Sequence, residues 1–135
     1  MTKTIRLFFL TLLCATVFAQ SNLRVFVSTY SQTEFSIAVS PVDPNRLLIG
    51  ANSVTASGSK YQGYYYSTSG GQSWGGADVL PWGAVQQTSA DPSVSFDRNG
   101  NAYFCFIGTQ NIRNPGRVLV VKSTDGGINW PTAPV

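Results

Sequence analysis

The stretch STDGGINW at residues 123–130 carries the clearest fold signal in the chain, because an imperfect copy, STSGGQSW, occupies residues 67–74. Both copies share the pattern Ser-Thr-x-Gly-Gly-x-x-Trp, and both follow a short apolar or aromatic run. Glycine reaches positive φ at little cost, and Ser, Asp and Asn side chains bond nearby backbone groups, so each copy predicts a tight turn after a strand. The Trp that ends each copy offers a large apolar face to bury.

The two copies belong to a longer internal repeat. Identical residues recur at offsets of 57, 58 and 56 positions, namely Ser36 and Ser93, Gly50 and Gly108, and Ser67 and Ser123. A nearly constant offset indicates a duplicated structural unit. With 13 Gly, 7 Pro and only 11% charged residues, the composition is typical of short strands joined by turns, and no helical spacing is sustained after the first 20 residues. The sequence therefore predicts an all-β protein.

Alternation of apolar residues places the strands of the two units. Strands are predicted at residues 35–39, 47–51, 63–67 and 78–87 in the first unit, and at 93–96, 101–107 and 117–122 in the second. Turns are expected at 41–45 and 97–100, where Asn-Gly is a strong hairpin signal, and loops at 52–62 and 108–116. A further strand is expected at 22–29, either as a closing strand for a last repeat or as a plain edge strand.

These residues resemble the Asp-box, or BNR, repeat S-x-D-x-G-x-x-W of sialidase-like β-propellers. The second copy matches it at Ser123, Asp125, Gly127 and Trp130. The first copy matches it at Ser67, Gly71 and Trp74, with Ser69 in place of the Asp. The resemblance covers most of the chain from Glu34 to Trp130.

The resemblance implies a partial β-propeller of about two four-stranded antiparallel blades, from a ring of six to eight. Residues 20–33 would form an N-terminal strand or linker, 34–90 the first blade, and 91–135 an incomplete second blade. Because a blade cannot bury both of its faces alone, the remaining blades would come from a longer chain or from other copies.

Residues 1–19 predict a secretory signal. Lys3 and Arg6 form its positive start, residues 7–18 its apolar centre, and Val17 and Ala19 the small residues before a cut at Gln20. The alternative, a membrane anchor, is disfavoured because the apolar run is shorter than the roughly 20 residues of a spanning helix. We therefore expect a secreted protein (extracellular, periplasmic or at the cell surface) with no membrane span after cleavage. Cys105 is then the only cysteine left, and we expect it to be a buried, unpaired thiol.

Charge and residue usage exclude several classes of function. Without Lys3 and Arg6 the chain has seven basic and six acidic residues, so nothing suggests binding to nucleic acid. His is absent, which excludes His-based triads and the usual His metal sites within this chain. Residues 97–101 alternate oxygen ligands as a calcium loop does, but they lack its bidentate Glu, and a hairpin turn explains them. We predict no metal and no cofactor.

Strand direction sorts the turns into two ends. The Asp-box turns share one end with turns 41–45 and 97–100, and we expect them to be structural. The opposite end collects the candidate ligand-binding residues Glu34, Lys60, Tyr61, Asp91, Arg113 and Arg117. Ligands of the resembled family bind over the central channel on this second face.

Glu34 and Asp91 are the most informative acids, since each opens the first strand of its unit. They could act as glycosidase carboxyl groups or, alternatively, accept hydrogen bonds from loop amides. Sialidases of the resembled family clamp a carboxylate with three arginines, the first in a Phe/Tyr-Arg-Ile-Pro motif that is absent here. No catalytic residue is assigned.

The prediction is a secreted BNR-repeat protein that binds an extracellular ligand such as a glycan, or an extracellular protein. Two alternatives stay open. One is the N-terminal part of an exo-sialidase or other glycoside hydrolase whose further residues lie beyond Val135. The other is a structural scaffold propeller. The chain alone is expected to lack glycosidase activity.

Overall fold

The protein is described by a computed structural model in which residues 22–81, 89–108 and 116–132 are placed. These residues form two antiparallel sheets and no helix. The first sheet has the order β1 (Ser31–Val39), β2 (Leu47–Val54), β3 (Lys60–Ser67) and β4 (Gly75–Ala77). The second sheet has the order β5 (Ser89–Phe96), β6 (Ala102–Gly108) and β7 (Arg117–Ser123). The prediction of an all-β protein is confirmed.

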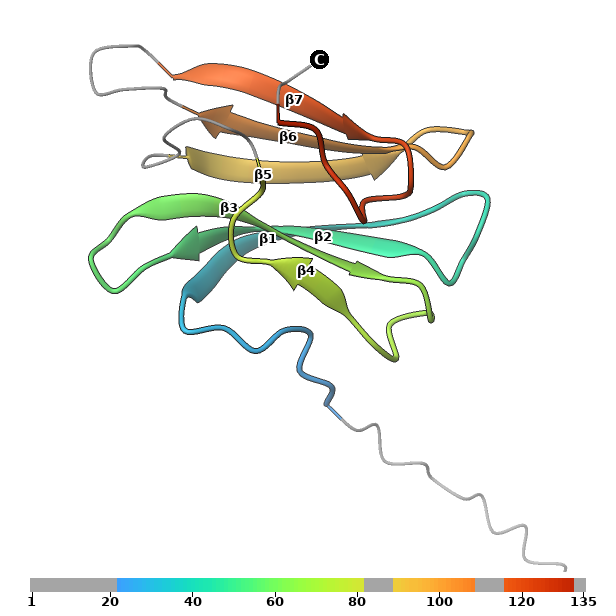
Figure 1. Cartoon of the computed structure of the whole chain (residues 1–135), viewed down its shortest axis with the longest axis horizontal. Helices are drawn as coiled ribbons and strands as arrows, with labels where there is room; N and C mark the ends of the chain where they lie inside the picture. The colour runs from blue at the N-terminus through green and yellow to red at the C-terminus, as the bar shows by residue number, and fades with distance from the viewer. Residues whose placement is uncertain (1–21, 82–88, 109–115, 133–135) are drawn as a thin grey trace, which may run out of the picture.

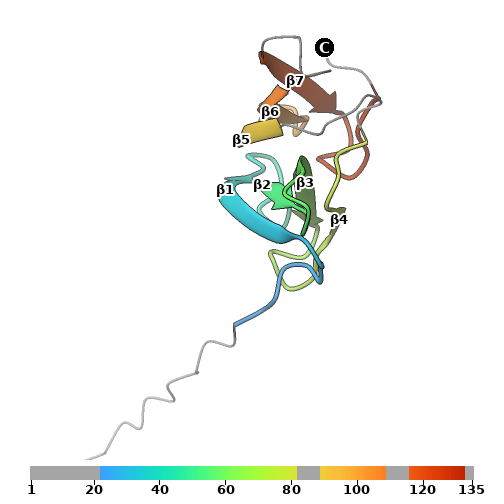
Figure 2. The ribbon, with the colours of Figure 1, turned by 90° about the vertical axis from the view of Figure 1, so that its left-hand side faces the viewer.

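The two sheets pack face to face, with β5 lying against β1 and β2 (Figures 1 and 2). Their shared core is made of aliphatic and aromatic side chains, namely Leu48, Leu80, Val94, Ala102, Phe104, Phe106, Val121 and Trp130. A Cβ at Gly50 would lie 2.9 Å from the Phe104 ring, so this glycine makes room for the ring. A direct polar contact joins β1 to β5, in which the backbone N–H of Val94 donates to Ser36 Oγ at 3.1 Å.

Strands β2 and β3 are longer than the sequence predicted. The prediction of a loop at 52–62 is wrong in extent, because the pairing continues to Val54 opposite Lys60. Only a tight turn remains, closed by bonds between Thr55 and Ser59. Three of the polar residues that suggested a loop, Asn52, Ser53 and Gln62, are buried in the sheet, and Gln62 Nε2 donates to Asn52 Oδ1 at 3.0 Å.

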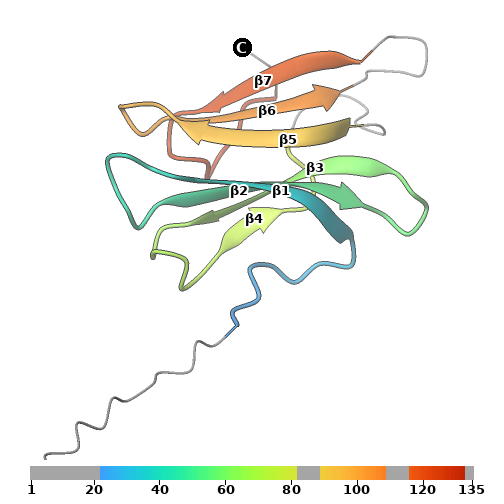
Figure 3. The same ribbon diagram turned by 180° about the vertical axis from the view of Figure 1, so that it is seen from behind.

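Residues 22–29 belong to neither of the two described sheets, so the prediction of a plain edge strand is wrong, and the closing strand for a last repeat stays a prediction. This segment forms no strand and runs along the outer side of the first sheet (Figure 3). Val25 and Phe26 pack there on Ile49, Ala51 and Tyr65. The Phe26 and Tyr65 ring centroids are 4.9 Å apart. Side-chain anchoring therefore replaces backbone pairing as the force that holds this segment.

The fourth strand also lies elsewhere than predicted. β4 is Gly75–Ala77, directly after the first Asp-box turn, and most of the predicted range 78–87 falls on residues 82–88, outside the described residues. Gly76 has a φ of 140°, and a Cβ there would run into the carbonyl O of Tyr64. Only glycine lets β4 approach β3 this closely.

The register also corrects one anchor of the internal repeat. Gly50 lies opposite Ser36, whereas Gly108 lies opposite Ser89 at the far end of its strand. Gly50 corresponds instead to Cys105, which lies opposite Ser93. The offset changes along the repeat because the β1–β2 connection is longer than the β5–β6 connection.

Cys105 is free, as predicted, but it is only partly buried. It alternates along β6 with Phe104 and Phe106, both of which belong to the core between the sheets. The thiol therefore lies on the outer face of the second sheet, and the expectation of full burial is wrong. Within the described part of the chain, no helix is long and apolar enough to cross a membrane.

Candidate functional site

The second Asp-box turn is closed by side-chain hydrogen bonds. Ser123 Oγ accepts from the Gly127 N–H at 2.9 Å and donates to Asp125 Oδ1 at 2.7 Å. Asp125 Oδ1 also accepts from the N–H groups of Ile128 and Asn129, at 3.1 and 3.0 Å. Asp125 Oδ2 accepts from Asn129 Nδ2 at 2.7 Å. The Ser123 hydroxyl and both carboxylate oxygens of Asp125 are thus used to hold the turn.

The first copy repeats this pattern with a hydroxyl in place of the carboxylate. Ser67 Oγ accepts from the Gly71 N–H at 2.9 Å. Ser69 Oγ accepts from the Ser73 N–H at 2.9 Å and lies 2.8 Å from Ser73 Oγ. Ser69 therefore occupies the position of Asp125 but holds fewer backbone groups.

The Trp that ends each copy closes the turn in the same way. Trp130 Nε1 donates to the Gly127 carbonyl at 3.1 Å, and Trp74 Nε1 donates to the Gly71 carbonyl at 2.9 Å. Trp130 is 7% exposed, and its ring meets that of Tyr64 edge-on at 6.1 Å, so the second box contributes to the core between the sheets.

The environment of Asp125 favours its charged form. Partial burial acts to raise the pKa of this carboxyl group. The bonds donated by Asn129, Ser123 and Ile128 act in the opposite direction and outweigh burial, so the pKa lies below its usual range. The carboxylate is therefore ionised near neutral pH and engaged in the turn, which leaves it little capacity for a ligand.

The two box turns lie at one end of the sheets with the β1–β2 and β5–β6 turns (Figure 1). The Gly70 N–H donates to the Asn45 carbonyl at 2.8 Å. Arg46 donates from Nη1 to the backbone carbonyl of Asp125, and its guanidinium occupies the space where a side chain at Gly126 would lie. The Arg46 side chain thus joins the first sheet to the second box.

The acid of the β5–β6 turn is a hairpin residue. Asp97 accepts from Asn99 N and Asn101 N, each at 2.9 Å, and from Asn101 Nδ2 at 2.7 Å. The Asn101 side-chain bond is the main cause that lowers the pKa of Asp97. Among the described residues, no group of three or more His, Cys, Asp or Glu side chains is arranged to hold a metal ion.

The opposite end of the sheets carries an unusual pair of acids. Glu34 and Asp91 have φ angles of 55° and 57°, and they are the only non-glycine residues with positive φ in the described part of the chain. Each lies in a β-bulge at the equivalent place in its sheet, between Thr33 and Ser36 in β1 and between Ala90 and Ser93 in β5. Both side chains are exposed.

Two side-chain amides, one bonded to the other, hold the Glu34 carboxylate by a hydrogen bond. Asn52 Nδ2 donates to Glu34 Oε2, and Gln62 Nε2 donates to Asn52 Oδ1 at 3.0 Å. Asn52 and Gln62 are 1% and 0% exposed. Gln62 Oε1 is buried and has no hydrogen-bond partner among the described residues. The sequence prediction missed both amides because it placed them in a loop; their pairing opposite one another in a hairpin was the signal that could have found them.

The other predicted site residues are distributed around this end. Lys60 is exposed, and its carbonyl accepts from Ser89 Oγ at 3.3 Å, which ties β3 to β5. Tyr61 is partly buried, with its ring 6.3 Å from that of Tyr30. Arg117 begins β7 opposite Gly108 and is exposed. Arg113 lies outside the described residues.

A second feature lies on the outer face of the first sheet. Asp78 accepts from Ser28 Oγ at 2.6 Å, Gln32 Nε2 at 3.1 Å and Tyr65 Oη at 2.9 Å, so one carboxylate ties the N-terminal segment to β1 and β3. Burial raises the pKa of Tyr65 well above its usual range, and the contact with Asp78 adds to this. Sequence reasoning gave Asp78 no role beyond the start of a strand.

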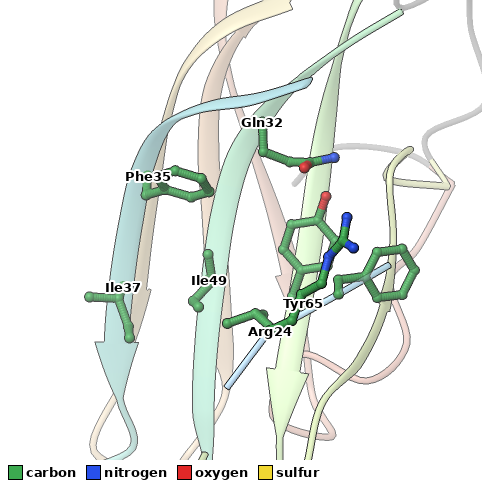
Figure 4. A pocket seen from close by; sticks show the side chains of 8 residues that line it. Arg24, Gln32, Phe35, Ile37, Ile49 and Tyr65 are labelled. Carbon is green, nitrogen blue, oxygen red and sulfur yellow. The ribbon is translucent and has the colours of Figure 1, made fainter. Parts of the chain in front are cut away.

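Beside this cluster is an apolar hollow of about 460 Å³ (Figure 4). Its walls are the side chains of Arg24, Val25, Phe26, Gln32, Phe35, Ile37, Ile49 and Tyr65. Most of the lining is apolar, so the hollow is poorly suited to a polar sugar.

Comparison with known proteins gives a fold likeness. No family model and no curated protein matches the chain. A solved structure from Dyadobacter fermentans DSM 18053, described as a protein of unknown function, matches with a TM-score of 0.54 at 17% sequence identity. The match covers 79% of this chain and 36% of that chain. The chain therefore spans about a third of its structural neighbour, and the likeness concerns the fold alone.

Proposed function

We propose that the chain forms two blades of a secreted, sialidase-like BNR-repeat propeller and binds an extracellular ligand such as a glycan at the end that carries Glu34 and Asp91. One observation carries this proposal: two acids hold the left-handed backbone conformation at equivalent bulges of both sheets.

The left-handed backbone conformation indicates that the carboxylate side chains of these two acids have a role, because glycine would fit both positions at lower cost. A left-handed non-glycine residue costs about 1–2 kcal/mol, and glycine would remove most of that cost. Strained residues that persist at equivalent positions are typical of binding and catalytic sites. Carboxylates accept hydrogen bonds from hydroxyl groups, which are the main polar groups of a sugar.

Neighbouring residues add suitable chemistry. Tyr61 offers an aromatic ring, and Lys60 and Arg117 offer cations near the same end. The Ser36–Val94 contact holds the strands just beyond the two bulges together, so one extended ligand can reach both acids.

The two Asp-box turns support the propeller part of the proposal. Their polar atoms are engaged within the turns, as expected of structural elements at the end away from a ligand. The face-to-face packing of two consecutive sheets is also the arrangement of neighbouring blades.

The positions of the arginines favour binding over sialidase catalysis. Arg24 lines the apolar hollow on the outer face, and Arg46 is bonded to the second box. Arg98 lies in the β5–β6 turn, at the box end. Among the described arginines only Arg117 lies at the bulge end, so these residues do not form the three-arginine clamp of an exo-sialidase.

A glycan array followed by calorimetry on the purified full chain tests the proposal. Glu34→Gln and Asp91→Asn remove charge with little change of shape, and each is expected to weaken binding about tenfold or more. Asp43→Asn, in the β1–β2 turn at the box end, is the matched control and should bind like the wild type.

Each alternative predicts a different result. A folded chain that binds no glycan would contradict the proposal and favour the scaffold alternative. Turnover of a fluorogenic sialoside by the chain would favour the glycosidase alternative.

A further inference from the structure

The carboxylate of Glu34 is joined to two buried amides, which we call the amide pair: Asn52 on β2 and Gln62 on β3. The two residues lie opposite one another in the hairpin, and Asn52 bonds to Glu34 in the bulge of β1. Glu34 is exposed, whereas the amide pair is almost completely enclosed. The hydrogen bonds therefore run from the surface into the sheet across three neighbouring strands.

The direction of these hydrogen bonds is set at the carboxylate. An ionised carboxylate only accepts hydrogen bonds, so Asn52 must turn its Nδ2 toward Glu34. Asn52 Oδ1 then faces Gln62, which must donate from its Nε2. The group left over is Gln62 Oε1, which is buried and has no partner among the described residues. The orientation of both amides thus follows from the acid at position 34.

The amide pair in turn restricts the carboxylate. Asn52 holds Glu34 at Oε2, and the left-handed backbone of the bulge fixes the start of the side chain. Because Asn52 is bonded to Gln62 as well, it has little freedom to turn. Glu34 Oε1 is then the oxygen that faces a ligand as a hydrogen-bond acceptor.

The second sheet does not support Asp91 in this way. Ile107 lies opposite Ala90 directly before the bulge, as Asn52 lies opposite Thr33, and Val118 lies opposite Ile107. Ile107 and Val118 are therefore the counterparts of the amide pair, and their aliphatic side chains cannot donate a hydrogen bond. The two acids share a backbone conformation but differ in what holds their side chains.

We propose that Asn52 and Gln62 are positioning residues that make Glu34 a hydrogen-bond acceptor of fixed direction, so that Glu34 recognises a ligand hydroxyl that donates to Oε1. This inference rests on the proposed function, because it names the group recognised at the same site. Asp91, without such support, contributes negative charge but no fixed direction. Asn52 is therefore a specificity-determining residue although it does not reach the surface.

Two substitutions remove and then restore the direction of the hydrogen bonds. In Glu34→Gln, both directions along the amides give the same number of bonds, so position 34 presents either a carbonyl or an N–H group to the ligand. Adding Asn52→Asp places an acceptor-only group in the middle. Gln62 and the new glutamine then both donate to it, and the carbonyl at position 34 again faces outward. Asn52→Asp alone instead sets two carboxylates against each other.

Thermal unfolding of the purified full chain without ligand tests this direction. Glu34→Gln should melt within about 3 °C of wild type, because a bond to Asn52 remains, and Asn52→Asp should melt about 10 °C lower or more. The double variant should recover at least about half of that loss. Asn52→Leu, which bonds to neither neighbour, is the control background, and Glu34→Gln should leave its melting temperature unchanged.

The double variant decides this part of the proposal. If it melts no higher than Asn52→Asp, the proposal is overturned. If Asn52→Asp alone does not fold, cooperative unfolding of the double variant supports the proposal, and an unfolded double variant overturns it.

Binding to a printed array of neutral glycans, which offer hydroxyl donors, tests the role toward the ligand. Folded Asn52→Leu and Glu34→Gln should each bind about tenfold more weakly than wild type, and the double variant should regain at least about threefold over Glu34→Gln. Asn52→Leu that binds like wild type, or a double variant that regains nothing, would overturn the positioning role and leave the proposed function standing. Wild type that binds none of these glycans contradicts the proposed function itself, whereas the melting temperatures still decide the direction of the hydrogen bonds.

Discussion

Converting the second Asp-box turn to the form of the first tests whether the boxes act by holding their own backbone. Asp125→Ser places at this position the residue that Ser69 provides in the first copy. The carboxylate accepts four hydrogen bonds, from Ser123, Ile128 and twice from Asn129. A hydroxyl at the equivalent place accepts one backbone bond and pairs with neighbouring hydroxyls.

The expected loss follows from this difference. Two hydrogen bonds are lost, from the Ile128 N–H and the Asn129 side chain, and each contributes about 0.5–1.5 kcal/mol net. Asp125→Ser should therefore lower the free energy of unfolding by about 2 kcal/mol at pH 7, or the melting temperature by about 10 °C. The reverse change, Ser69→Asp, should raise the free energy of unfolding by about 1 kcal/mol.

The pH dependence of the stability difference between wild type and Asp125→Ser identifies the Asp125 carboxylate as its cause. Because the folded-state pKa of Asp125 lies below its ordinary value of 3.8, its contribution is present above that value and is lost as pH falls through the folded-state pKa. Urea unfolding of wild type and Asp125→Ser should show the full difference in stability at pH 7, and this difference should shrink progressively as the pH is lowered below 3.8. Asp43→Ser, which removes a single bond to Asn45 N, is the control and should cost well under half as much. Equal stabilities at pH 7, or a pH-independent difference, would refute the reasoning.

Three further substitutions test other parts of the fold. Gly76→Ala should destabilise the protein by more than about 2 kcal/mol in thermal unfolding, because its Cβ meets the Tyr64 carbonyl; an unchanged melting temperature would contradict the close approach of β4. Tyr65→Phe loses the bond to Asp78 and should cost about 1 kcal/mol at pH 7. Since the pKa of Tyr65 is raised above 10.0, its contribution is present below pH 10 and is lost as pH rises through the folded-state value, so the variant should show a shallower alkaline loss of stability than wild type. Asp91→Gly should gain up to about 1 kcal/mol in urea unfolding by relieving the left-handed backbone while abolishing ligand binding, and a loss of stability would argue against strain at this bulge.

Local chemistry made much of the fold predictable from the sequence. Alternating apolar residues located the first three strands of each unit, and the Asn-Gly hairpin at 97–100 is formed as predicted, because these signals depend on neighbours along the chain. The fourth strand was misplaced because Gly75–Ala77 carries no apolar alternation, and its position depends on room beside β3.

The candidate site was predictable only in part. Strand direction alone placed Glu34 and Asp91 at the same end, away from the boxes. Their left-handed backbone was not predictable, since neither Glu nor Asp carries the signal that glycine would give at such a position. Asn52 and Gln62 were missed because polar side chains are also typical of a loop, and only their pairing opposite one another across the hairpin indicates that they are buried.

The bond between Arg46 and the second box depends on the order of the two repeats along the chain. Gly126 leaves space for the guanidinium, whereas a Cβ at its counterpart Gly70 would lie 3.3 Å from Oδ1 of the shorter Asn45 side chain. The duplicated units have thus become distinct partners, one supplying the long cation and the other the bare backbone that receives it. A chain engineered with the two repeats in the opposite order would retain each turn but separate Arg46 from the second box. The contact between the units therefore requires their present order.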